Sequence, residues 1–413
     1  MTYIIKRVVA GIFTAFSLCG LVSFAGFAAD GKVGLFGIAD ASVFLRYRLE
    51  LVDQDGLPEN ATASILQTLF AVKTGNTNGF EAFAEFRNVT NIGAENYNNT
   101  LNGRTQFPVV ADPESTDVDQ AYLSYTGLEG TKISVGRQKL VWGNKRFVSK
   151  LVWRQNHRSF DGVFLESKLA KGLELKYAYA FNVNRAFTDR SPIGNFDGNF
   201  HLADLYYDVA GFGKLTAYGY SLDMDDGFAA ALSTRTLGAN FTGSRPVSDS
   251  VKIGYLVEAA HQKDIGNNPF DIGVGYFRAE PSVSVNGFKV RAGYEVLGGN
   301  GTRGFQTPLA LLHAYNGWAD KFLVTPANGL RDKYAELTYR LPASSGLAGT
   351  NIIVAYHRFD SDVGNIKYGT EWNAAVSKKL FGRVTALAKV AFYSADGFAT
   401  DTTKVWFQLV TKF

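Results

Sequence analysis

The sequence predicts an all-β protein, a transmembrane antiparallel β-barrel of about eighteen strands with short periplasmic turns and long extracellular loops. Three observations support this fold class. Apolar and polar residues alternate with period two along most of the chain, and the charges in the clearest alternating segments keep to one face. Aromatic residues make up 14% of the sequence, yet no apolar run after the one at residues 8–24 is long enough for a membrane-spanning helix. A barrel whose alternate residues face lipid and water accounts for all three.

The alternation is clearest in four segments, residues 42–51, 173–182, 251–260 and 288–297. In each segment every charged residue belongs to the same face. A Lys or Arg on the lipid face would cost about 2 to 4 kcal/mol at the bilayer midplane, so this partition favours lipid-spanning strands over a soluble sandwich. The charged residues of these segments that we expect in the lumen are Arg46, Arg48, Glu50, Glu174, Lys176, Lys252, Glu258, Lys289, Arg291 and Glu295.

The connections between the predicted strands are alternately short and long, which is itself typical of membrane barrels. The short ones, predicted to be periplasmic, include residues 75–79, 127–130, 170–172, 286–287 and 381–382. The long ones, predicted to be extracellular, include residues 91–115, 141–159, 184–200 and 298–331. The strands near Ser64 and Leu202 alternate poorly, so sixteen strands are the alternative to eighteen.

Residues 1–29 are predicted to be a secretory signal peptide, and residues 30–413 the barrel. Lys6 and Arg7 precede an apolar stretch at 8–24, and small residues follow it as at a cleavage site. The alternative, a transmembrane helix, needs about 20 apolar residues and anchoring flanks. Cys19 is the only cysteine and lies in this segment, so the mature chain is expected to form neither a disulfide nor a thiolate metal site.

The last ten residues, 404–413, alternate again and end on Phe413. A final strand that closes on a terminal Phe resembles the outer-membrane assembly signal, which implies the barrel-assembly machinery as a partner beside outer-membrane lipid. Together with the signal peptide, this strand predicts the outer membrane of a Gram-negative bacterium. The net charge of +4 includes two cations of the signal peptide, so the charge gives no reason to expect a nucleic-acid partner.

A dense group of cations follows one predicted strand. It combines a Gly-Arg-Gln, a Gly-x-x-Arg, a Trp-Arg-Gln and a Phe-Asp-Gly element, found at Gly136-Arg137-Gln138, 143–146, Trp153-Arg154-Gln155 and Phe160-Asp161-Gly162. This series resembles the alginate-export family of bacterial outer-membrane channels. The segment 317–332 is similar to one found in family members whose substrate is not established. The resemblance implies a role in the pore for the residues Arg137, Arg146, Arg154 and Asp161.

The position of the cationic loop has two interpretations. It is either a constriction folded into the lumen or an external loop held by Arg–carboxylate pairs. For the second segment, within 298–331, we expect an extracellular gate or a partner surface. Lumenal Arg and Lys favour anions, since Arg binds carboxylates bidentately. The alternative is that buried Arg–Glu pairs only brace the lumen.

The predicted function is an outer-membrane channel for passive diffusion or export of anionic or polar solutes. The expected solute is an anionic oligo- or polysaccharide or a small organic anion. The alternative is a general or uptake porin for small organic acids or aromatic compounds. No enzyme is predicted, because His157, Ser159 and Asp161 would crowd one short strand, which is sterically awkward for a hydrolase triad. The five histidines show no paired ligand spacing, so we expect no metal and no cofactor.

Overall fold

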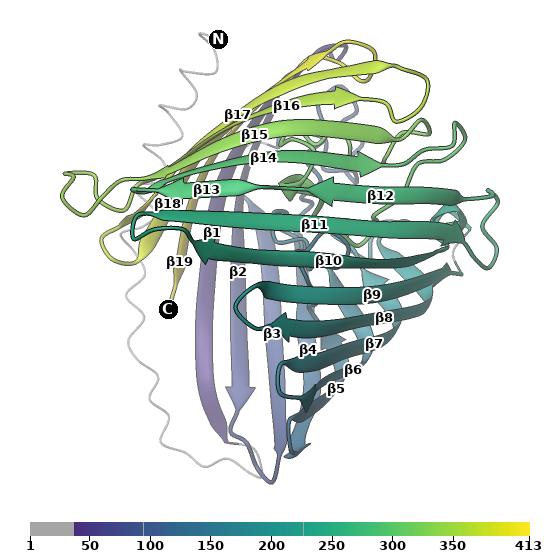
Figure 1. The fold of residues 1–413 in the computed structure, drawn as a ribbon, viewed down its shortest axis with the longest axis vertical. Helices are drawn as coiled ribbons and strands as arrows, with labels where there is room; N and C mark the ends of the chain where they lie inside the picture. The colour runs from purple at the N-terminus through teal and green to yellow at the C-terminus, as the bar shows by residue number, and fades with distance from the viewer. Residues whose placement is uncertain (1–36, 94, 226) are drawn as a thin grey trace.

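The strands of the computed structural model form one closed antiparallel sheet (Figure 1). The structure describes residues 37–93, 95–225 and 227–413, so the predicted signal peptide lies outside the described residues. Closure is made by β1 (Ile38–Gln54), which pairs with β2 (Ala61–Thr74) on one side and with β19 (Thr402–Lys412) on the other. The final strand of the chain therefore seals the barrel.

The other strands follow one another around the barrel in sequence order. Their bounds are β3 (Phe80–Asn91), β4 (Ser115–Leu128), β5 (Thr131–Gln138), β6 (Ser159–Ala170), β7 (Leu173–Asn184), β8 (Asn195–Val209), β9 (Gly213–Met224), β10 (Thr234–Pro246), β11 (Val251–Asp264), β12 (Gly273–Ala279), β13 (Ser282–Val285), β14 (Phe288–Leu297), β15 (Leu330–Arg340), β16 (Asn351–Asp360), β17 (Lys367–Leu380) and β18 (Val384–Ala395).

Two of these segments are halves of one strand. Both β12 and β13 pair with β11 and β14, and Pro281 lies in the gap between them. Proline has no backbone N–H for the ladder, so the pairing is interrupted there without a change of register. The barrel therefore has eighteen strands, which confirms the predicted number. The helices in the described residues are two short 3-10 turns, η1 (Ala230–Leu232) and η2 (Leu312–Ala314). None of the described helices is long and apolar enough to span a membrane.

The predicted division of each strand into two faces is confirmed. Large apolar side chains such as Phe70, Leu123 and Val163 are exposed on the outward face. Arg48 and Glu50, on the inward face of β1, are almost fully buried. At the short-turn end, outward aromatic residues stack in pairs, as in Phe288–Tyr339 with ring centroids 4.0 Å apart. Such pairs suit the interfacial girdle of a membrane barrel.

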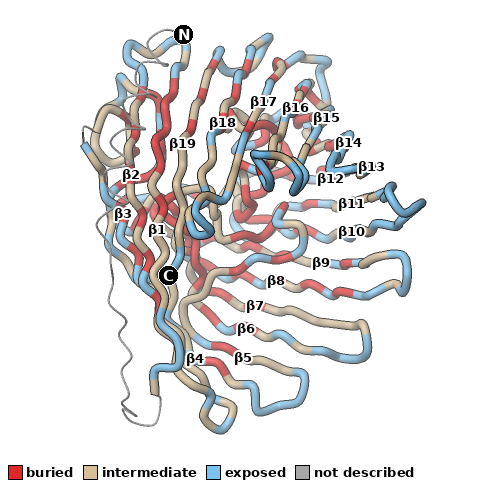
Figure 2. The backbone as a smooth tube through the Cα atoms, turned by 90° about the vertical axis from the view of Figure 1, so that its left-hand side faces the viewer, coloured by how far each residue is buried: buried red, intermediate tan, exposed pale blue. Residues whose placement is uncertain are grey.

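The connections also follow the prediction, with one difference. Turns of a few residues alternate with long loops, of which residues 92–114, 139–158 and 298–329 are the longest. The loop predicted at 184–200 is shorter, because β8 already begins at Asn195. Figure 2 shows that the buried stretches continue from the strands into chain segments enclosed by the barrel.

Long loops fold into the lumen and form an apolar core there. Phe147 of loop 139–158 and Phe305 of loop 298–329 lie in one buried cluster, with ring centroids 6.0 Å apart. The inward side chains of β8, including Phe200 and Leu202, belong to the same cluster. This explains why the strand near Leu202 alternates poorly in sequence: its lumenal face contacts apolar loops rather than water. The expectation that segment 298–331 is an extracellular gate or partner surface is therefore wrong, because this segment packs inside the barrel.

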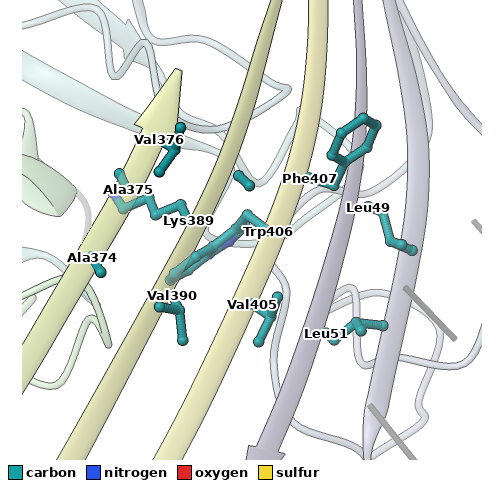
Figure 3. A pocket seen from close by; sticks show the side chains of 11 residues that line it. Leu49, Leu51, Ala374, Ala375, Val376, Lys389, Val390, Val405, Trp406 and Phe407 are labelled. Atoms are coloured by element: carbon teal, nitrogen blue, oxygen red, sulfur yellow. The ribbon is translucent and has the colours of Figure 1, made fainter. Parts of the chain in front are cut away.

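A depression of about 370 Å³ lies at the seam where β19 meets β1 (Figure 3). Most of its lining residues occupy outward positions by strand register, with Ala374 and Ala388 as the small residues and Leu49 and Phe407 at its side. The depression therefore belongs to the membrane-facing wall and is not part of the lumen.

Candidate solute pathway inside the barrel

The Trp-Arg-Gln element of loop 139–158 is docked on the inner wall formed by β1 and β2. Arg46 of β1 donates hydrogen bonds to Gln155 Oε1 at 2.7 Å and to the carbonyls of Val152 and Arg154 at 2.7 and 2.5 Å. Gln67 of β2 donates to the Gln155 carbonyl. Of the two interpretations of this loop, the lumenal one is therefore correct, and Arg46 is buried beneath it.

Arg154 contacts carboxylates from two loops and one strand that are distant from one another in the sequence. Its guanidinium lies 3.4 Å from Asp112 Oδ2, 3.2 Å from Asp320 Oδ2 and 3.7 Å from Glu50 Oε2. These carboxylates belong to loop 92–114, loop 298–329 and β1. Burial lowers the pKa of Arg154, but the three carboxylates outweigh it and raise the pKa above its usual value. Lys404 of β19 contacts Asp320 at 3.2 Å and completes the link to the wall.

Trp153 lies between two polar groups at the same level. Arg48 is 4.0 Å from its ring centroid, and His313 of loop 298–329 stacks on it with a centroid distance of 4.0 Å. Lys389 of β18 is 4.3 Å from the Trp153 ring and 3.7 Å from the Trp318 ring. The middle of the lumen thus brings Arg48 and Lys389 together with indole rings, which contact both cations.

The two histidines in these loops are held in the neutral form. His157 Nδ1 lies 3.0 Å from Asp119, while its Nε2 accepts from Gln67 at 3.2 Å. His313 is bound in the same way, with Asp320 on Nδ1 at 2.7 Å and Lys389 on Nε2 at 2.6 Å. An accepting Nε2 carries no proton. Burial, with Lys139 near His157 and Lys389 near His313, holds both pKa values well below the usual range.

The loops 139–158 and 298–329 are also fastened to each other. The Ser149 amide donates to the Leu309 carbonyl at 2.8 Å, and the Leu311 amide donates to the Lys145 carbonyl at 3.0 Å. Arg158 donates to the carbonyls of Ala310 and Pro308 at 3.1 and 2.8 Å. Burial lowers the pKa of Arg158 to about 9. The two loops therefore act as one constricting body inside the lumen.

Arg146 anchors this body to the opposite wall. Its Nε is 2.7 Å from Glu295 Oε1 of β14, and its Nη2 donates to Asn316 Oδ1 at 3.0 Å. Tyr276 and Asn316 donate to the two oxygens of Glu295, each at 2.7 Å. Glu295 is 1% exposed, so its charge depends on these partners rather than on water.

A series of alternating charges continues from this anchor toward the short-turn end. Arg278, which is paired with Glu295 in the β12–β14 register, lies 2.8 Å from Glu280. Arg291 contacts Glu280 at 3.0 Å and Glu336 at 2.6 Å. The space between this wall and loop 298–329 is about 30 Å³, which holds only one or two water molecules. While loop 298–329 keeps this position, this side of the lumen has no room for an organic solute.

The inner wall at the short-turn end carries cations of a different kind. Lys252 of β11 and Lys289 of β14 flank Ser284 of β13 in one row of the sheet. Both lysines are exposed, and neither forms a salt bridge within the part of the chain that the structure describes. Lys176, in contrast, lies 3.5 Å from both Glu166 and Glu174. Lys252 and Lys289 therefore contribute unneutralised positive charge to this mouth.

Arg137 and Asp161 lie elsewhere than the family resemblance implied. Arg137 follows Val135 on the outward face of β5, and Asp161 occupies the same face of β6 beside Val163. They form a bidentate pair at 2.7 and 2.9 Å near the ends of these strands. The pair fastens neighbouring strands together on the side away from the lumen. These two side chains therefore do not line the lumen.

Several residues of the constriction were not singled out in the sequence. Asp112 and Asp320 hold Arg154, Arg158 ties the loops together, and Lys404 and Trp406 are among the inward residues of the last strand. The strand residues have a signal in the sequence, because the alternation of 404–413 puts them on one face. The loop aspartates have none, since their partners lie far away in the chain.

The protein is an outer-membrane channel of a Gram-negative bacterium. Its closed eighteen-stranded barrel has a charged, loop-filled lumen and an apolar outer belt. The chain belongs to the alginate export family, whose model matches residues 40–265, more than half of its length. No curated protein sequence matches the chain significantly.

Solved structures of similar fold are outer-membrane channels with low sequence identity. OccAB4 of Acinetobacter baumannii matches with a TM-score of 0.69 and 16% identity, covering 90% of this chain and 98% of its own. OccK9 (OpdG) of Pseudomonas aeruginosa has a TM-score of 0.71 and 14% identity over 90% and 97% of the two chains. The structure of Pseudomonas aeruginosa OpdK with vanillate has a TM-score of 0.68 and 16% identity over 91% and 98%. At these identities the likeness concerns the fold.

Proposed function

We propose that this outer-membrane channel carries organic anions by passive diffusion, and that their carboxylates bind to lumenal guanidinium groups one after another. The observation that supports this most is the state of Arg46 and Arg48. Both face the lumen, and neither forms an ion pair with a carboxylate in the described residues. Their hydrogen bonds go to Gln155, to Gln408 and to loop carbonyls, all of them neutral acceptors.

A solute carboxylate is a stronger acceptor for a guanidinium than a neutral carbonyl or amide. When loop 139–158 shifts, a carboxylate can therefore replace its carbonyls at Arg46. The neighbouring Glu50 and Asp112 keep the site from holding the anion tightly, which suits release to either side. The exposed Lys252 and Lys289 attract the same anions at the short-turn mouth. Solutes of this class include uronate oligosaccharides, as the family name suggests.

Aromatic acids are the second candidate solute class. Trp153 and Trp318 flank Lys389, so an aromatic carboxylate would find stacking surfaces and a cation in one place. The vanillate in the OpdK structure, an aromatic carboxylate in a channel of the same fold, adds support for this alternative. Direction of transport is set by the solute gradient under either alternative.

Single-channel recording in a planar bilayer under a salt gradient tests the proposal. The protein is expected to show an anion-selective reversal potential, and Arg46→Gln with Arg48→Gln should move it toward zero because two lumenal charges are lost. Block by uronate oligomers or by vanillate, added in turn, identifies the solute class. Lys333→Gln with Arg358→Gln, on the outward face, removes two charges outside the lumen and serves as the control. A reversal potential that the Arg46 and Arg48 substitutions leave unchanged would rule out this pathway.

A further inference from the structure

Two cations oppose each other directly on the outward face of the barrel. Arg235 of β10 and Lys263 of β11 are register partners, and both are exposed. Neither has an ion pair or hydrogen bond within the described part of the chain. Like charges placed directly opposite in a sheet repel each other and destabilise it. An anion from outside the barrel wall would relieve this repulsion.

Their depth in the membrane indicates where that anion comes from. Arg235 is the second residue of β10, and Lys263 the last but one of β11, at the long-loop end of both strands. The next outward residue of β10, Leu237, is 60% exposed and starts the apolar belt. The two cations thus lie one row outside the hydrocarbon boundary. This is the level of the lipid headgroups, which in the outer leaflet belong to phosphorylated glycolipids.

A second cation pair on the same face shows what compensates such an arrangement. Lys333 of β15 and Arg358 of β16 are also register partners near the long-loop end. Asp360 Oδ2 lies 3.2 Å from Lys333 Nζ and 3.4 Å from Arg358 Nε, so one carboxylate oxygen serves both cations. Asp360 follows Arg358 by two residues. The residue that follows Lys263 by two is Ile265, which has no charge.

We propose that Arg235 and Lys263 bind a phosphate group of the outer-leaflet glycolipid, which takes the place that Asp360 fills in the other pair. Lys is a common phosphate ligand, and Arg binds phosphate through two parallel hydrogen bonds. His261, exposed and on the same face of β11, lies beside the pair toward the apolar belt. Asp223 is the carboxylate of β9 nearest along the face, and it forms no salt bridge with either cation.

The experiment uses the refolded barrel with lipid A that carries its phosphates and with dephosphorylated lipid A, and counts bound lipid by native mass spectrometry. The protein should retain one phosphorylated lipid A and bind the dephosphorylated form far less. Arg235→Gln with Lys263→Gln should weaken retention roughly 25-fold, at about fivefold for each cation near an anionic surface. Lys333→Gln with Arg358→Gln is the matched control and should leave retention unchanged, because Asp360 already occupies the anion position between those two cations.

A substitution that adds a carboxylate, instead of removing the cations, makes the test sharper. Ile265→Asp supplies an internal carboxylate in the position of Asp360, so it should lower lipid A retention while every cation stays in place. Asp360→Asn should create a second retained lipid A at Lys333 and Arg358. Equal retention by the protein and by the Arg235 and Lys263 variant would overturn the proposal. Displacement of the bound lipid A by inorganic phosphate at the same concentration would also overturn it.

Discussion

Replacing Arg154 with methionine is expected to release loop 139–158 from the wall and to raise the mean conductance of the channel several-fold. The substitution keeps the side-chain volume but leaves Glu50, Asp112 and Asp320 as buried carboxylates without their shared cation. Removing one partner of a buried ion pair costs about 3 to 5 kcal/mol, mainly because the remaining charge is uncompensated. The loop can avoid this cost by leaving the wall, which lets water reach the carboxylates.

Two measurements check this expectation for Arg154→Met. Single-channel recording should show a larger and noisier current, and limited proteolysis should cut within residues 139–158, where the parent protein resists. Arg154→Lys is the control, since it keeps the charge but loses the planar contact to several carboxylates. Its current and its cleavage should be intermediate between those of the parent protein and those of Arg154→Met. A current and cleavage pattern identical to those of the parent would show that Arg154 does not hold the loop.

The pair of Arg146 and Glu295 should show strong coupling in a double-mutant cycle. Arg146→Met leaves Glu295 charged and 1% exposed, with hydrogen bonds from Tyr276 and Asn316 only. We expect a loss of about 3 to 5 kcal/mol in the free energy that docks the loops. Glu295→Gln alone strands the buried Arg146 guanidinium in the same way. The double variant removes both charges, so most of the loss should be recovered.

The docking free energy for this cycle can be followed by urea titration of loop proteolysis, with the barrel kept folded. Conductance of each variant gives an independent measure of loop position. If the losses of the two single variants simply add up in the double variant, the two side chains do not depend on each other and the anchor is placed wrongly.

The sequence predicts the barrel well because its main signal is local. Period-two alternation in 42–51 places Arg46 and Arg48 inside and Leu49 outside, and the register between β1 and β19 agrees with it. Alternation also carries Arg137 to the outward face with Val135. The family resemblance pointed the other way, and the structure follows the alternation.

The constriction could not be predicted in the same way, because its contacts join residues far apart in the chain. Arg154 and Asp320 are 166 positions apart, and Arg158 contacts the carbonyl of a residue 152 positions away. Nothing in a single sequence pairs such residues. The weak alternation near Leu202 was the one available hint, since an apolar inward face requires an apolar lumenal partner. That partner is the pair of loops folded inside.

Loops 139–158 and 298–329 close the lumen of a channel that would otherwise conduct freely. Replacement of residues 140–157 by a short Gly-Ser linker tests whether the loops close the lumen, with single-channel conductance as the readout. We predict a several-fold larger conductance than that of the parent protein. The same linker in place of residues 343–348, an exposed connection between β15 and β16, should change nothing. Equal conductance of the 140–157 variant and the parent would show that solutes pass elsewhere.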